Sequence, residues 1–271
     1  MNESKTAKTA LVTGGAVGIG KGVALAFASR GYDIAISHFG EEDQANAVAA
    51  RIRNEFGRTC FVRPCDLTEA AAPSALVGEA VRELGRLDVL VNNAGVSRFS
   101  DVRKLTPGEF DRLVHLNLRA PLLAMQAAAA HMVERGIRGS IVNITSTRAE
   151  RAHPGDAVYG ATKAGLTRAS QSAALDLAPY GIRVNCVAPG ATASREGEDV
   201  RRWYEAIGRK IPLGRTGTTA DIGEACAWLA SEQAAYVTGT TLRVDGGLIV
   251  PGMPEDVSPE AGYGWGRPFA D

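Results

Sequence analysis

The sequence predicts an α/β protein in which a parallel sheet carries helices on both faces. Short apolar runs alternate with helical segments along the chain, which is typical of this fold class. The apolar runs are continuous and do not alternate with polar residues, as expected for strands that are covered on both sides. Because no repeat, linker or low-complexity tract interrupts this order, we expect one domain over residues 1–250.

Each predicted element follows from a local pattern. In the first helix, Ile19, Val23, Ala26 and Phe27 recur at helical spacing. The fourth helix begins with Thr106-Pro107-Gly108-Glu109, which combines an N-cap, an early proline and a capping-box acid. The predicted strands are 9–12, 33–37, 60–63, 87–91, 139–145, 182–187 and 240–244. The predicted helices are 18–29, 41–56, 73–84, 106–133, 156–178 and 219–231.

Composition excludes several classes of function. Lys+Arg and Asp+Glu both total 30, so the chain of 271 residues has no formal net charge and no global field for nucleic acid or an anionic membrane. The N-terminal segment lacks the apolar run of a signal peptide, and no segment reaches the roughly 20 apolar residues of a membrane helix. The four cysteines form no CxxC pair, so we expect reduced thiols, no metal site and a cytoplasmic protein.

A glycine-rich loop lies between the first strand and the first helix. It reads TGGAVGIG over Thr13–Gly20, with glycines at 14, 18 and 20. Missing side chains let the backbone approach a pyrophosphate, and the helix N-terminus points free amides at it. A tight turn of some other α/β protein is the alternative. Asp66, after the third strand, is either an adenine ligand or a helix cap, and Asn93 borders the same crevice.

Tyr159 and Lys163 lie four residues apart on a predicted helix, so they share one face. A tyrosine pKa of roughly 10 is too high for a base near neutrality, and a nearby ammonium lowers it. Ser146, at the end of the fifth strand, can reach the same reacting oxygen. A surface helix pair is the alternative for the YxxxK spacing alone, and the position of Ser146 argues against it.

These motifs together resemble the short-chain dehydrogenase/reductase family across about residues 6–250. TGGAVGIG matches its TGxxxGxG, NNAG is unchanged, and the PG after the sixth strand is present. The resemblance implies a single-domain Rossmann-type doubly wound parallel sheet of about seven strands. It also implies that Tyr159 exchanges the substrate proton, Ser146 stabilises the oxyanion, and Lys163 holds the nicotinamide ribose and lowers the Tyr159 pKa. Asn117 matches the fourth catalytic position and keeps a water in a proton relay.

The predicted cofactor site is drawn from six segments of the chain. Its residues are Gly14, Val17, Gly18, Ile19, Ser37, His38, Asp66, Leu67, Asn93, Ala94, Gly95, Tyr159, Lys163, Pro189, Gly190, Thr192 and Ser194. Ser194 stands where the family usually has threonine and keeps the hydroxyl. After the second strand there is neither an Asp that demands NAD nor an Arg that demands NADP. Because two glutamates follow at 41 and 42, we favour NAD, with NADP as the alternative.

The resemblance is greatest to bacterial glucose 1-dehydrogenases and related sugar dehydrogenases. It implies oxidation of a sugar C1 hydroxyl, from aldose to lactone. The loops expected to contact substrate carry Arg98, Arg148, Arg151 and Arg195, which suit a carboxylate, phosphate or sulfonate. We therefore expect an anionic sugar, such as a uronate or a sulfonated hexose; solvated surface charge is the alternative.

Two other functions stay open at this point. One is a carbonyl or 3-oxoacyl reductase, which predicts NADPH preference, and the other is a non-catalytic cofactor-sensing protein. The resemblance implies a homotetramer assembled through the two long helices. The Pro/Gly-rich tail, 251–271, is expected either to fold over an active site, its own or a neighbouring subunit's, or to be disordered.

Overall fold

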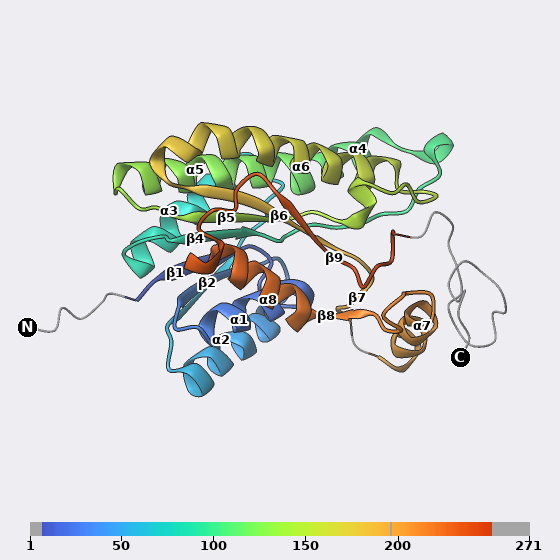
Figure 1. Cartoon of the computed structure of the whole chain (residues 1–271), viewed down its shortest axis with the longest axis horizontal. Coiled ribbons are helices and arrows are strands. Elements are labelled where there is room, and N and C mark those ends of the chain that lie inside the picture. Colours follow the sequence, from blue (N-terminus) through green and yellow to red (C-terminus); the bar gives the residue numbers. More distant parts are fainter. Residues whose placement is uncertain (1–6, 196, 251–271) are drawn as a thin grey trace, which may run out of the picture.

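The computed structural model describes residues 7–195 and 197–250. Its centre is a seven-stranded parallel sheet with helices on both faces (Figure 1), which confirms the predicted fold class. The tail at 251–271, predicted either to cover an active site or to be disordered, lies outside the described residues. The sheet strands are β1 (Thr9–Val12), β2 (Asp33–His38), β3 (Cys60–Pro64), β4 (Val89–Asn92), β5 (Ser140–Ile144), β6 (Arg183–Pro189) and β9 (Thr241–Val244).

The order of the strands fixes the position of the site. The sheet runs β3-β2-β1-β4-β5-β6-β9, so the chain leaves β1 toward one edge and returns to the other side of it at β4. β1 pairs with β2 through Leu11↔Ala35 and with β4 through Leu11↔Leu90. In open parallel sheets the ligand crevice forms at such a reversal, outside the carboxyl ends of the strands.

One face of the sheet is covered by α1 (Gly18–Ala28), α2 (Glu42–Phe56) and α8 (Thr219–Ala230). α1 and α8 are in close backbone contact. A Cβ atom added at Gly22 would lie 2.4 Å from the Thr219 carbonyl oxygen, and one at Gly223 would lie 2.6 Å from the Gly22 oxygen. Both positions therefore require glycine.

The opposite face is covered by α3 (Ala72–Leu84), α5 (Ala120–Glu134) and α6 (Ala157–Leu177), the last two drawn above the sheet in Figure 1. Their apolar side chains meet the strands in a second core. The largest fully buried side chains here are Leu11, Leu76, Leu87, Leu90, Met132, Ile141 and Ile182.

The helix predicted at 106–133 is interrupted. α4 (Pro107–Val114) and α5 are separated by a π-helical turn, His115–Arg119. Pro121 has no amide hydrogen to donate to the carbonyl four residues earlier, that of Asn117, so an unbroken α-helical ladder cannot pass this point. The capping box predicted at Thr106 and Glu109 is confirmed.

Three elements at the carboxyl end of the sheet were not predicted. They are β7 (Thr192–Ala193), β8 (Gly217–Thr218) and the helix α7 (Glu198–Gly208), which lies beside them in Figure 1. Residues 191–210 were expected to be a substrate loop. α7 carries Glu198 and Asp199 in its first turn, which stabilise a helix N-terminus.

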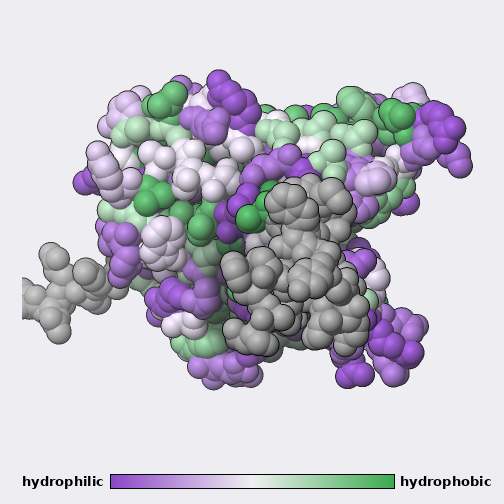
Figure 2. All heavy atoms as spheres, turned by 45° about the vertical axis from the view of Figure 1, so that its right-hand side comes forward, coloured by the Kyte–Doolittle hydropathy of each residue, from purple (hydrophilic) through white to green (hydrophobic). Residues whose placement is uncertain are grey.

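The surface mixes charged and apolar residues. In Figure 2 hydrophobic atoms gather along the upper edge, over the layer formed by α4, α5 and α6. Leu175 is 78% exposed and Phe110 46% exposed in that layer. No helix in the described part of the chain is long and apolar enough to cross a membrane. Within the same residues, no cluster of His, Cys, Asp or Glu side chains could hold a metal ion, and the four cysteines are free thiols.

Candidate active site

The glycine-rich turn at the end of β1 is built from residues that cannot carry a side chain. Gly14 and Gly18 have φ values of 63° and 54°, in the left-handed region that favours glycine. A Cβ atom on Gly20 would lie 2.0 Å from the Gly14 oxygen, and one on Gly15 would lie 2.5 Å from Ile36 Cγ2. The importance of Gly15 was missed, because the GxxxGxG spacing does not include it.

The first turn of α1 is open to an anion. Its N-cap, Val17, is 43% exposed and makes no side-chain hydrogen bond to the helix amides. Unpaired amides at a helix N-terminus attract phosphate. Ser194 lies against this turn, since a Cβ atom on Gly18 would be 3.3 Å from Ser194 Cβ. The Ser194 amide donates to the Tyr204 hydroxyl over 3.1 Å, so α7 holds this residue in place.

β4 ends in an asparagine motif that fastens this turn. The amides of Asn93 and Ala94 donate to Thr13 Oγ1 over 2.9 and 3.0 Å. Asn93 Nδ2 in turn donates to the carbonyls of Thr13 and Gly14. The predicted cofactor residues of the two strands that flank the topological reversal are therefore brought together.

Three side chains at and just after the end of β2 have defined surroundings. Ser37 Oγ accepts from the Gly14 amide over 3.1 Å, so this hydroxyl is committed to the glycine turn. His38 is 5% exposed and its Nδ1 has no hydrogen-bond partner among the described residues. Glu41 Oε2 accepts from the Phe39 amide over 2.9 Å, which turns its carboxylate back toward β2.

Asp66 closes a turn of its own. Its Oδ1 accepts from the Thr68 amide over 2.9 Å and from the Thr68 hydroxyl over 2.7 Å, and these bonds lower its pKa. The adjacent Leu67 is 6% exposed. This bonding closes a turn and caps no helix, since the next helix, α3, has Ala71 as its N-cap; it occupies one carboxylate oxygen of Asp66.

The segment after β6 turns tightly. A Cβ atom on Gly190 would lie 2.7 Å from Asp245 Cβ, so the PG turn requires glycine. Thr192 Oγ1 donates to the Gly190 carbonyl over 3.2 Å. Pro189 and Thr192 thus lead the chain from β6 toward Ser194 and the glycine turn.

Tyr159 and Ser146 meet at the carboxyl end of β5. α6 carries Tyr159, and Ser146 is the N-cap of the short helix η3 (Thr147–Ala149). The Ser146 side chain lies close enough to the Tyr159 phenol to lower its pKa. Burial raises the pKa of the Tyr159 phenol, while the Ser146 hydrogen bond and the Arg148 charge lower it. The sequence predicted this pairing, and the structure brings both groups together.

Lys163 lies beside Tyr159 and Ser146 in a buried position. Its Nζ donates to the Ile144 carbonyl over 2.9 Å and lies 5.8 Å from the centre of the Tyr159 ring. Burial lowers the pKa of Lys163 to about 8. For the Tyr159 phenol, desolvation raises the pKa and the Arg148 charge lowers it, and the role of Lys163 toward the phenol stays a prediction.

Asn117 lies in the π-helical turn, fully buried. Its Oδ1 accepts from the Val96 amide over 3.0 Å and its Nδ2 donates to the Val96 carbonyl over 2.9 Å. The side-chain amide is thus occupied, and Pro121 cannot donate to the Asn117 main-chain carbonyl. Gly95 lies between the catalytic groups, since a Cβ atom there would be 2.9 Å from Asn117 Oδ1 and 3.4 Å from Lys163 Nζ.

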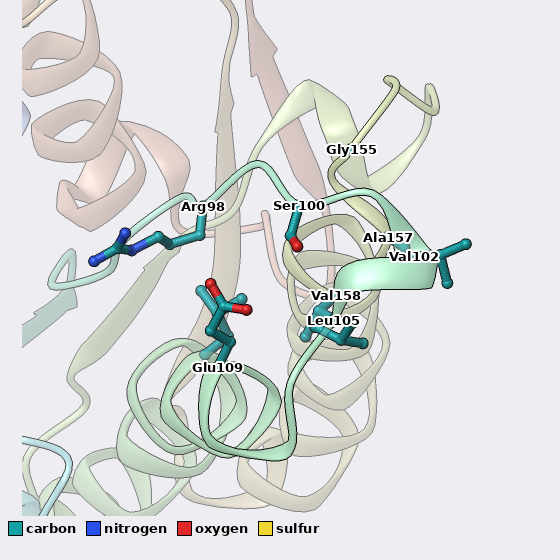
Figure 3. Close-up of a pocket in the computed structure, with 9 residues that line it drawn as sticks. Arg98, Ser100, Val102, Leu105, Glu109, Gly155, Ala157 and Val158 are labelled. Carbon is teal, nitrogen blue, oxygen red and sulfur yellow. The ribbon is translucent and has the colours of Figure 1, made fainter.

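The structure separates the four arginines predicted for substrate. Arg148 follows Ser146, and its guanidinium carbon lies 4.6 Å from the centre of the Phe99 ring. Arg195 lines a cleft of about 980 Å³ beside α7. Arg98 lines a pocket of about 10 Å³ and extends away from its other labelled side chains (Figure 3), so that pocket holds no sugar. Arg151 lies between Arg148 and Asp156 in the chain.

These features fit a dinucleotide. The positive-φ glycines, the uncapped helix N-terminus and the unpartnered buried His38 ring nitrogen leave room and polar groups for a ligand at one edge of the sheet. The phenol and the ammonium lie at that same edge. Groups of this kind can hold a nicotinamide cofactor and exchange a proton with a substrate oxygen.

Comparison with known proteins decides the family. Residues 14–249 match the family model described as Enoyl-(Acyl carrier protein) reductase. The chain belongs to the short-chain dehydrogenase/reductase family. The expected family resemblance and an NAD(P)-dependent oxidoreductase activity are thereby confirmed.

The relatives of this short-chain dehydrogenase/reductase differ in substrate. It is 38% identical to a 3-oxoacyl-(acyl-carrier-protein) reductase of Staphylococcus aureus, over 91% of this chain and all of the relative. It is 32% identical to glucose 1-dehydrogenase 2 of Bacillus subtilis, over 92% and 98%.

Solved structures agree with the fold. An acetoin dehydrogenase of Salmonella typhimurium is 34% identical with a TM-score of 0.85, over 94% of this chain and 98% of that one. A blue fluorescent protein from a metagenomic library, solved in complex with NADPH, is 34% identical with a TM-score of 0.82, over 89% and 98%.

Proposed function

We propose that this enzyme oxidises the C1 hydroxyl of a small sugar to a lactone, and that the sugar is anionic, such as a uronate or a sulfonated hexose. The observation that carries the proposal is that Ser146, directly after β5, and Tyr159, on α6, lie close together at the carboxyl edge of the sheet. A phenol and a hydroxyl on one edge can share a single substrate oxygen.

Tyr159 and Ser146 have different roles toward the substrate hydroxyl. The Tyr159 phenolate takes the proton of the substrate hydroxyl as the hydride leaves the same carbon, and Ser146 donates to the oxygen as it becomes a carbonyl. The nicotinamide supplies the hydride acceptor. Lys163 and the main-chain carbonyl of Asn117 are proposed to hold the ribose and a relay water respectively.

The anionic character of the sugar rests on arginines that line the cleft beside α7. Arg195 shares its cleft with Arg201, Arg209 and Arg215, against the acids Glu198 and Glu205. Among the described residues Arg195 and Arg209 have no ion pair, so they are available to a carboxylate or sulfonate. Arg98, Arg148 and Arg151 remain further candidates.

NAD is the proposed cofactor. The Glu41 carboxylate is turned back onto the Phe39 amide at the end of β2. An acid at the end of this strand accepts from a ribose 2′-hydroxyl and repels a 2′-phosphate. NADP is the alternative.

Reduction of a 3-oxoacyl thioester or another ketone is the second candidate. The 38% identity to a 3-oxoacyl reductase over the whole relative favours it. This candidate predicts NADPH as the donor.

A substrate panel decides between these proposals. Glucose, glucuronate and a sulfonated hexose are offered with NAD⁺ and NADP⁺, and acetoacetyl-CoA with NADH and NADPH, while absorbance of the reduced nicotinamide is followed. The first proposal expects kcat/KM for the acid-bearing sugars to exceed that for glucose by about tenfold or more. If only the thioester is reduced, the sugar proposal is refuted and the second candidate function is supported.

We also propose a homotetramer. The exposed apolar residues of the α4–α6 layer, among them Leu175 and Phe110, form a surface that a second copy of the chain would cover.

A further inference from the structure

Arg119 joins two segments that are far apart in the sequence. It is the last residue of the π-helical turn His115–Arg119, and its Nη2 atom donates to the main-chain carbonyl of Thr68, 51 residues earlier. Thr68 lies in the segment that follows β3. The Arg119 side chain therefore ties that segment to the turn that carries Asn117.

Thr68 belongs to the turn that holds the Asp66 carboxylate. The amide and the hydroxyl of Thr68 donate to Asp66 Oδ1 over 2.9 and 2.7 Å. The Glu69 amide donates to the Asp66 carbonyl over 3.2 Å, so the segment from Asp66 to Glu69 is one closed turn. The Thr68 hydrogen bonds and then the Arg112 charge lower the pKa of Asp66, which is therefore ionised at neutral pH. A shift of the Thr68 main chain would move this carboxylate with it.

The Asp66 turn lies at the edge of the sheet where a dinucleotide would bind. The Cys65 amide donates to the His38 carbonyl over 2.8 Å, which joins the chain after β3 to the end of β2. β3, β2 and β1 are neighbours in this order, and the crevice forms outside the carboxyl ends of the strands. With the pyrophosphate at the glycine turn after β1 and Tyr159 on the β5 side, the nicotinamide extends toward β5. The adenine half then extends toward β2 and β3, where Asp66 lies.

The other end of the Arg119 link lies among the catalytic groups. Asn117, two residues before Arg119, is hydrogen-bonded through its side chain to the main chain of Val96, and its Nδ2 also donates to Thr162 Oγ1 over 3.4 Å. The Thr162 hydroxyl donates to the Tyr159 carbonyl over 2.8 Å. The π-helical turn is thus fixed to the catalytic helix, and Arg119 sets the position of the Asp66 turn relative to it.

The surroundings of Arg119 allow its side chain to be replaced without loss of the fold. The residue is half-buried, and its Nε atom is buried without a hydrogen-bond partner. A buried donor without a partner costs folding free energy. A methionine would fill a similar space and remove that cost together with the Thr68 contact, so we expect Arg119→Met to fold.

We propose that Arg119 is a positioning residue for the adenine end of the bound dinucleotide. By holding the Thr68 carbonyl, it keeps the Asp66 carboxylate at the place where it accepts a hydrogen bond from the adenine amine. The proposal rests on the dinucleotide site of the proposed function, with Asp66 as its adenine ligand, and is independent of the sugar.

A cofactor analogue without the adenine amine tests the proposal. Nicotinamide hypoxanthine dinucleotide carries an oxygen in place of that amine, so it has no donor at this position. Its binding and that of NAD⁺ are measured by calorimetry on the full chain without substrate. The wild type is expected to prefer NAD⁺ by about tenfold or more, because the analogue loses a hydrogen bond to a charged group. Arg119→Met is expected to reduce this preference to about threefold or less, mainly through weaker binding of NAD⁺.

Three further variants act as controls. Arg119→Lys keeps a donor of similar reach and is expected to restore most of the preference. Arg51→Met removes an arginine from an exposed ion pair with Glu55 on α2 and is expected to leave both affinities unchanged. Asp66→Asn leaves an oxygen for Thr68 but presents an amide nitrogen to the adenine amine, so it should reduce the preference as far as Arg119→Met does. The double variant of Asp66 and Arg119 should lose no more preference than Asp66→Asn alone.

The outcomes separate this proposal from the proposed function. Equal weakening of both dinucleotides in Arg119→Met would give the residue a structural role only and overturn the proposal. A full preference for NAD⁺ in that variant would refute the link through Thr68 and leave the adenine site in place. A wild type that binds both dinucleotides equally would remove Asp66 from the adenine amine and refute the proposal too, whereas a wild type that binds neither would refute the dinucleotide site itself. Because no substrate is present, a failed sugar assignment does not affect this measurement.

Discussion

At the residue scale, burial rather than charge pairing dominates the catalytic groups. Lys163 is 4% exposed, its Nζ donates to the Ile144 carbonyl, and burial lowers its pKa to about 8. Between pH 8 and the ordinary value of 10.5, the unfolded chain holds a proton on this lysine that the folded chain has lost. Stability therefore rises with pH across this window, and below it the full penalty of a buried ammonium applies.

Replacement of Lys163 is expected to lower activity and to raise the free energy of unfolding. Lys163→Met should raise the free energy of unfolding at pH 7 by on the order of 2 kcal/mol, because no charge is then buried. The gain should vanish as the pH approaches 10.5. Urea unfolding at pH 7 and pH 10 measures it. Lys104→Met, on the exposed helix η1 (Val102–Lys104), is the control. A variant less stable than wild type at pH 7 would contradict this view of the site.

Glu41 gives a prediction for the cofactor. Glu41→Gln removes the carboxylate that is turned toward β2. We expect the KM for NADP⁺ to fall about tenfold relative to that for NAD⁺, since a negative charge no longer faces the 2′-phosphate. Initial rates with both cofactors measure this ratio. Glu42→Gln changes a neighbouring acid of the same size and serves as the control. An unchanged ratio in Glu41→Gln would place the carboxylate away from the ribose.

At the element scale, the packing of α1 on α8 depends on glycine. Gly22→Ala is expected to lower the free energy of unfolding by about 2–4 kcal/mol, because its Cβ would lie 2.4 Å from the Thr219 carbonyl oxygen. Gly78→Ala on α3 is the matched control. A Cβ there meets nothing within 4 Å, so it should stabilise by roughly 0.5–1 kcal/mol. Chemical denaturation of both variants measures these changes, and equal effects would refute the argument.

The helices and strands also show how much of the fold could be predicted from the sequence. All seven strands of the central sheet were predicted, because buried parallel strands are short apolar runs between turns. The break at His115–Arg119 was missed although Pro121 signals it, since the apolar spacing continues across the π-helical turn. α7 was missed although its sequence signals it, since Val200, Trp203, Tyr204 and Ile207 recur at helical spacing.

The site was predictable where one motif fixes the chemistry. The glycine turn, the asparagine motif and the pairing of Tyr159 with Ser146 all follow from local spacing. The contacts of Arg148 with Phe99 and Asp156 could not be predicted from the sequence. Phe99 lies 49 residues before Arg148 and Asp156 eight residues after it, and only the folded loop brings the three together. The direction of the Tyr159 pKa also required the fold, since it depends on burial.

At the scale of the whole molecule, the apolar surface over α4–α6 predicts assembly. Leu175 on α6 is 78% exposed. If a second copy covers it, Leu175→Arg should dissociate a particle of about 114 kDa, four chains of 28.4 kDa, into smaller species. Light scattering coupled to gel filtration measures the mass. Leu213→Arg, another exposed leucine at 72%, lies outside this layer and is the control. A monomeric wild type would refute the proposed tetramer.

The whole account depends on proton exchange at one phenol beside a bound nicotinamide. The direct measurement compares wild type with Tyr159→Phe, following NAD(H) binding by fluorescence and turnover by absorbance of the reduced nicotinamide. We predict that the variant binds the cofactor within about twofold of wild type and loses about 10²- to 10⁴-fold in kcat. Turnover that survives the loss of this hydroxyl, or a wild type that binds no dinucleotide, would contradict the account.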